Sequence, residues 1–147
     1  MRPLLNGGTL GGRVNHVITK TDMIDSMLVA CPSFRPAWDD FVTEWSTEDD
    51  KPLYLALSSL ARRLLDLLAT RQESELSQAF AVVERWHVEG DAYVREAATI
   101  GVLENLQNEN IHTSTSPEEI VPFLRPESLK WWRKVEAFSA NGTPIVE

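Results

Sequence analysis

The chain has 147 residues and a formal net charge of −8. Hydrophobic residues make up 43% of it and charged residues 24%, which is ordinary for a globular domain and argues against wholesale disorder. A single cysteine, Cys31, rules out an intramolecular disulfide or a cysteine-based zinc site. No apolar run approaches the roughly 20 residues of a membrane-spanning helix, and residues 1–12 lack the apolar core of a secretion signal. We therefore expect a cytoplasmic protein that does not enter a membrane.

The chain divides into a lead-in and one domain. Residues 1–18 are predicted to be a flexible, glycine-rich lead-in, and residues 19–147 a single helical domain. The four glycines between positions 7 and 12 are not followed by the Gly-Lys-Ser/Thr of a phosphate-binding loop, so we interpret them as linker.

Helical spacing of apolar residues continues from the start of the domain to its end. The predicted helices cover about residues 19–31, 34–45, 53–69, 74–88, 92–106, 116–122 and 126–141. No segment shows sustained strand alternation. The sequence therefore predicts an all-α fold, either a single compact bundle or a short stack of helical hairpins, with about six to seven helices.

Three of these helices carry informative faces. The apolar positions of residues 53–69 cover more than half of the helix circumference, which predicts a central, buried helix. Residues 74–88 are expected to direct Leu76, Phe80 and Val83 inward, together with Trp86 or His87. Residues 92–106 present small residues at helical spacing, a pattern that permits close helix packing.

The negative charge is concentrated in one segment. Between Asp22 and Asp50 there are eight acidic residues and one basic residue, Arg35, which gives this stretch a net charge of −7. Aromatic residues recur at helical spacing through residues 34–45, so we expect that helix to have one aromatic and one acidic face. Acidic helix faces are often simply solvated, but like charges accumulate here at some cost in stability. The segment should repel nucleic acids and membranes and attract basic partners.

The best enzyme-like feature is the pair Glu84 and His87. Their spacing of three is that of the Glu-x-x-His motif in di-iron bundles, but such sites need two of these motifs and further inward carboxylates. We interpret His87 as a helix-end histidine hydrogen-bonded to a nearby acid. We therefore expect no catalytic residue, no metal and no cofactor.

The tandem Trp131-Trp132 allows two interpretations. Adjacent helical residues point about 100° apart, so Trp132 is expected in the core and Trp131 at an edge beside Lys130, Arg133 and Lys134. A tryptophan at the edge of the fold, next to basic residues, could stack on a partner or a nucleic acid. We favour a Trp131 that is half-covered by its own neighbours.

Three segments carry a resemblance to a known family. They are the run from Phe80 to Asn108, Leu60-Ala-Arg with the later Leu67, and Phe123-Leu-Arg-Pro-Glu-Ser followed by Trp131-Trp132. Together they resemble a family of small uncharacterised bacterial all-helical proteins, over about residues 20–140. The resemblance implies no established activity, cofactor or catalytic residue. Gly90-Asp-x-x-Val-Arg-x-x-Ala is also similar to one helix of a HEAT-type repeat, but a repeat array needs several such units.

These observations favour a non-catalytic protein-binding domain. The most concrete form is a bacterial immunity or antitoxin-like inhibitor, in which an acidic face occludes a basic toxin or effector. The alternative is a regulatory or scaffold domain that acts as a homo-oligomer, for example a homodimer joined through the aromatic face. The residues expected to meet the basic partner are Asp39, Asp40, Glu44, Trp45, Glu48, Asp49 and Asp50, with Trp45 as an exposed aromatic anchor.

Overall fold

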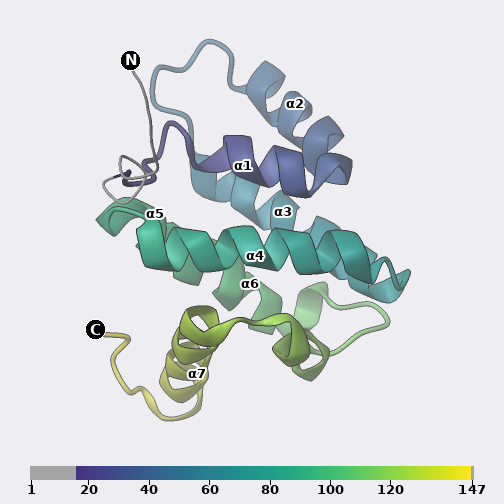
Figure 1. The fold of residues 1–147 in the computed structure, drawn as a ribbon, viewed down its shortest axis with the longest axis vertical. Coiled ribbons are helices and arrows are strands. Elements are labelled where there is room, and N and C mark those ends of the chain that lie inside the picture. Colours follow the sequence, from purple (N-terminus) through teal and green to yellow (C-terminus); the bar gives the residue numbers. More distant parts are fainter. Residues whose placement is uncertain (1–15, 147) are drawn as a thin grey trace, which may run out of the picture.

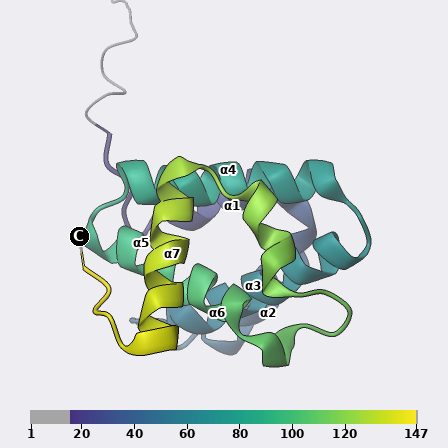
Figure 2. The same ribbon diagram turned by 90° about the horizontal axis from the view of Figure 1, so that it is seen from below.

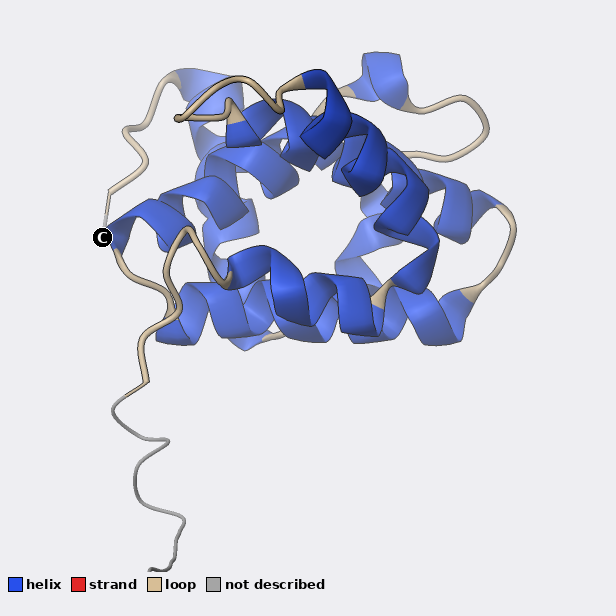
Figure 3. Cartoon of the chain, turned by 90° about the horizontal axis from the view of Figure 1, so that it is seen from above, coloured by secondary structure: helices blue, strands red, loops and turns tan. Residues whose placement is uncertain are grey.

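The computed structural model describes residues 16–146 and contains seven α-helices and no strand in that range. The α-helices are α1 (Met23–Ala30), α2 (Arg35–Glu44), α3 (Leu53–Ala69), α4 (Glu73–Glu89), α5 (Ala92–Glu96), α6 (Glu104–Gln107) and α7 (Pro126–Asn141). Shorter turns are the 3-10 helices η2 (Pro32–Phe34), η4 (Glu109–Ile111) and η5 (Pro117–Phe123), and the π-helix η3 (Ala97–Leu103). The predicted all-α fold is confirmed, and Figure 3 shows the helices joined by loops alone.

The two long helices α3 and α4 lie at the centre of the arrangement. In Figure 1, α4 runs across the middle, with α1 and α2 above it and α7 below it. Nine apolar residues of α3 are buried, namely Leu53, Ala56, Leu57, Leu60, Ala61, Leu64, Leu65, Leu67 and Leu68, whereas Leu55 is 53% exposed. The prediction of a central, buried helix over residues 53–69 is confirmed, with the same bounds.

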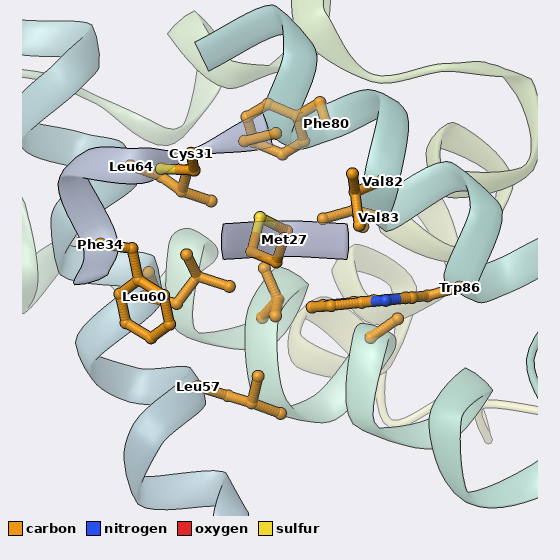
Figure 4. Close-up of a cluster of buried hydrophobic side chains, with 14 of the residues drawn as sticks. Met27, Cys31, Phe34, Leu57, Leu60, Leu64, Phe80, Val82, Val83 and Trp86 are labelled. Carbon is orange, nitrogen blue, oxygen red and sulfur yellow. The ribbon is translucent and has the colours of Figure 1, made fainter. Parts of the chain in front are cut away.

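The core forms where α1, η2, α3 and α4 meet. Figure 4 shows Met27 between Leu60 and Trp86, with further apolar side chains from α3 and α4 around it. Trp86 is fully buried, and its indole N–H donates a hydrogen bond of 3.1 Å to the carbonyl of Met23. Cys31 is also buried, and this burial raises the pKa of its thiol to about 11, which is the state of an inert core cysteine.

Residues 92–107 form one continuous helical rod that contains a π-helical stretch. Asp91 caps its start, since its carboxylate accepts a hydrogen bond of 2.9 Å from the Val94 N–H. The small-residue face packs on α3 as predicted: a Cβ added at Gly101 would lie 2.6 Å from Leu57 Cδ1. A side chain at this position would therefore force Leu57 to shift, and glycine allows the close approach without that rearrangement.

The described structure begins before the predicted domain boundary at residue 19. Ile18 is only 3% exposed, and its N–H donates to the carbonyl of Glu89 while its carbonyl accepts from the N–H of Asp91, both at 2.9 Å. Placing Ile18 in the lead-in was therefore wrong. A turn between α4 and α5 holds it, and local sequence carries no signal of that contact. Residues 1–15 of the predicted lead-in lie outside the described residues.

The C-terminal helix completes the fold on the side opposite α2. Figure 2 shows α7 and the segment before it on the same side of the molecule, next to α4. Trp132 and Val135 are buried on its inner face, whereas Phe138, one turn further on, is 47% exposed. The helix ends at Gly142, whose φ of +77° suits glycine.

Candidate protein-binding surface

Helix α2 separates its aromatic and acidic faces as the sequence predicts. Phe34 and Phe41 are buried. Trp38 is half-buried, and its ring centroid lies 5.4 Å from that of Phe41. The aromatic face is therefore the inner face of α2, turned toward the core. The core therefore covers most of the aromatic surface through which a homodimer would have to pack.

Six predicted carboxylates form what we call the acidic surface: Asp39, Asp40, Glu44, Glu48, Asp49 and Asp50. The first three lie on α2 and the others in the loop to α3, and all six are exposed. In the part of the chain that the structure describes, Asp50 alone among them forms an ion pair. The other five carboxylates form no ion pair within residues 16–146, although the Lys51 ammonium lies in the same loop, 3.2 Å from the backbone carbonyl of Glu48.

Trp45 lies at the C-terminal end of α2 and not on the acidic face. Its N–H donates to the carbonyl of Phe41, and its side chain is half-buried and packs against the core. The expectation of an exposed aromatic anchor at Trp45 was wrong in this respect. Helical spacing put Trp45 on the same side as Phe41, and the core covers that side.

The loop that carries Asp50 is tied to the start of the domain. The Lys20 ammonium donates to Asp50 Oδ1 at 2.8 Å and lies 5.2 Å from the ring centroid of Tyr93. The hydrogen bond from Lys20 lowers the pKa of Asp50, and the same bond raises the pKa of Lys20. The acids at positions 49 and 50 suggest a side-chain cap for α3 from either Asp49 or Asp50, but no side chain caps the helix and Pro52 holds the N-cap position.

Glu84 and His87 lie on the face of α4 that receives α7. The Glu84 carboxylate accepts the N–H of Glu127 at 3.0 Å and that of Ser128 at 2.9 Å, and so caps the first turn of α7 from another helix. In residues 16–146, no group of three or more histidine, cysteine or carboxylate side chains could hold a metal ion. Glu84 therefore has a structural role at the start of α7.

His87 is buried and bonded to hydroxyl groups, so the predicted acid partner was wrong. Its Nδ1 lies 2.9 Å from Ser128 Oγ and its Nε2 lies 3.1 Å from Thr99 Oγ1. Burial lowers the pKa of His87 to about 4, which leaves the ring neutral near pH 7. Local sequence carries no signal that Ser128 and Thr99 are its partners, because both lie in other helical segments.

Trp131 is half-covered by its neighbours, as favoured above. Its ring stacks on that of His87, with centroids 6.4 Å apart and planes 6° apart. The Lys134 and Lys130 ammonium groups lie 4.7 Å and 5.7 Å from its centroid. Lys130 also bonds Glu127 of the same helix at 3.2 Å.

The fold is that of a small all-helical domain. Residues 24–140 match the model of a family described as a domain of unknown function, DUF7674, and the chain belongs to that family. No curated protein and no solved structure matches the chain. The predicted membership of an uncharacterised family is thereby confirmed, while the bacterial origin and the helical-repeat similarity stay predictions. Across the described residues, no helix has the length and apolar character that crossing a membrane requires.

Proposed function

We propose that this chain is a non-catalytic protein-binding domain whose acidic surface occludes a basic protein partner, in the manner of a bacterial immunity or antitoxin-like inhibitor. One observation carries the proposal: five exposed carboxylates of the acidic surface have no cationic partner within residues 16–146. Solvated like charges repel one another, so their concentration on α2 and the following loop lowers stability. Binding of a basic partner would relieve the repulsion between these carboxylates, and this relief would contribute to the free energy of binding.

The placement of the acidic surface supports rapid capture of such a partner. It lies at one end of the molecule, on α2 and the loop after it, away from α7 (Figure 1). The aromatic face of α2 is packed against the core and holds this helix in place, whereas the Lys20–Asp50 ion pair is solvent-exposed and adds little. A preorganised charged surface raises the association rate and loses little entropy on binding.

Charge reversal tests the proposal. The tagged chain is used to capture partners from a lysate of its source organism at low and high salt, and the affinity of the captured protein is then measured. We expect one stoichiometric basic protein whose affinity is at least about tenfold weaker at high salt. The triple variant Asp39→Lys, Asp40→Lys and Glu44→Lys should abolish the capture.

A matched control carries the same change in net charge elsewhere. Glu73→Lys, Glu109→Lys and Glu118→Lys reverse three exposed acids on other elements and should leave the capture intact. Equal loss in both variants would show that net charge alone is responsible, which contradicts the proposal. If only a salt-resistant oligomer of the chain itself is recovered, the regulatory or scaffold alternative replaces it.

A further inference from the structure

A pocket of about 270 Å³ lies between the helical rod of residues 92–107, α7 and the C-terminal tail. Its lining includes Arg95, Glu96 and Thr99 from the rod, Trp131 from α7 and Ile145 from the tail. None of these residues belongs to the acidic surface. Figure 1 shows α7 and α2 at opposite ends of the molecule, so the pocket is a separate feature.

The lining combines an apolar wall with two opposite charges. Trp131, Ile100 and Ile145 supply apolar area, and all three are half-buried. Arg95 and Glu96 are consecutive in a helix, so their side chains point about 100° apart around its axis. Thr99 lies one turn further on, between these two directions. A ligand in this pocket would therefore meet a cation on one side, an anion on the other and apolar side chains beside them.

The wall that holds Trp131 is rigid. Trp131 stacks on His87, and His87 is fixed by hydrogen bonds to Ser128 and to Thr99. Among the described residues, His87, Thr99 and Ser128 are the buried polar residues, and they form this one chain beside the pocket. Fixed side chains behind a binding surface keep it in the shape that a ligand needs.

The backbone of the rod is also unusual at this place. The π-helix η3 spans Ala97–Leu103 and so includes Thr99 and Ile100 of the pocket lining. π-Helical turns are rare within α-helices and occur frequently at functional sites. Because of the π-helix, Thr99 and Ile100 are not in the positions around the helix axis that a regular α-helix would give them.

The C-terminal tail closes one side of the pocket. Ile145 is half-buried and lines the pocket. The carbonyl of the next residue, Val146, accepts a hydrogen bond from the Lys134 ammonium. Lys134 in turn lies over the ring of Trp131. Lys134 thus contacts both the tail and the tryptophan that forms the apolar wall.

We propose that this pocket binds a free apolar α-amino acid. The ligand carboxylate would bind Arg95, its ammonium group Glu96, and its side chain would lie against Trp131, Ile100 and Ile145. A guanidinium carries five N–H donors, so Arg95 can bind a carboxylate in addition to its existing interaction. The volume lies just below the range of roughly 300–1,000 Å³ that drug-sized ligands occupy, which selects a ligand of amino-acid size.

Titration of L-phenylalanine into the ¹⁵N-labelled full chain tests this proposal by NMR. We expect saturable shifts of the Trp131 indole N–H and of the Thr99 and Ile100 amides. Phenylacetate and 2-phenylethylamine each lack one of the two charges and should bind at least about tenfold more weakly, since each loses a charge-assisted hydrogen bond. No saturable shift, or equal binding of either analogue, would overturn the proposal.

Two variants locate the site. Ala92→Trp places a large ring at the exposed mouth of the pocket and should abolish the shifts, whereas Ala69→Trp, an exposed alanine at the end of α3, should leave them unchanged. Arg95→Gln removes the carboxylate partner and should weaken L-phenylalanine at least about tenfold without altering phenylethylamine binding. Unchanged L-phenylalanine binding in both pocket variants would place the ligand elsewhere and refute the proposed site.

Discussion

At the scale of single residues, His87 is the side chain whose charge state the fold controls most strongly. It is 4% exposed and both ring nitrogens bond hydroxyl groups, so the neutral ring is satisfied and a protonated ring would be desolvated. Burial therefore lowers its pKa from the ordinary value of 6.5 to about 4. A neutral histidine held in this way positions helices and is a poor proton acceptor at neutral pH.

This lowered pKa predicts a loss of stability in mild acid. Between pH 6.5 and about 4 the unfolded chain binds a proton at His87 and the folded chain does not, so protonation favours unfolding. The free energy of unfolding should fall by an amount on the order of 3 kcal/mol across this window and gain nothing further from His87 above pH 6.5. Urea unfolding followed by tryptophan fluorescence at several pH values measures it.

The variant His87→Gln provides the control. Glutamine can bond one of the two hydroxyl groups but does not titrate, so the variant should be less stable at pH 7 and show a flatter pH dependence from 6.5 to 4. An unchanged slope in this variant would assign the acid sensitivity to other groups.

At the scale of elements, the start of α7 depends on a carboxylate from α4. Arg125 occupies the N-cap position of α7 without a side-chain cap, and Glu84 accepts two of the backbone N–H groups that a helix leaves unpaired at its start. One residue thus joins two helices that are far apart in sequence. The Glu-x-x-His spacing places Glu84 and His87 on one face of α4, and both contact α7.

We predict that Glu84→Ala lowers the free energy of unfolding by about 1–2 kcal/mol, because two charge-assisted hydrogen bonds are lost. Glu84→Gln keeps one acceptor oxygen and should cost about half as much. Urea unfolding at pH 7 provides the comparison, and Glu89→Ala, which removes an exposed ion pair with Arg85, should cost no more than about 0.5 kcal/mol. Equal effects at positions 84 and 89 would contradict the capping role.

At the scale of the whole molecule, the uneven charge distribution should reduce stability in the absence of a partner. Asp40 and Glu44 are four residues apart on the exposed side of α2, where like charges repel. The double variant Asp40→Asn, Glu44→Gln should therefore be more stable by roughly 0.2–0.5 kcal/mol at low salt, and by less at high salt. Thermal and urea unfolding at both salt concentrations measure the gain.

The same change in charge at Glu109→Gln, Glu118→Gln serves as the control and should bring no gain, since these acids lie in different helices. A loss of stability in the Asp40/Glu44 variant would show that the acidic face of α2 supports the fold. A gain in stability together with a loss of partner capture is the combination expected of a binding surface.

Local patterns predicted most of the helices and their buried faces. The nine buried positions of α3 follow from helical spacing, and the structure confirms them. The Asp91 cap and the Gly142 stop likewise depend on residues within a few positions of one another. The six carboxylates are exposed as expected, because a charged side chain without a partner stays in water. The binding role assigned to them is still a prediction.

The sequence by itself therefore determined the all-α class, the central helix and the position of the negative charge, since these follow from helical periodicity and composition. Tertiary structure alone decided that Ile18 is core, that Trp45 turns inward, that His87 bonds Ser128 and Thr99, and that Glu84 caps α7. Each of these contacts joins segments distant in the chain, and the packing of helices selects them. Spacing along one helix shows which side chains share a face, but only the neighbouring helix decides what that face meets.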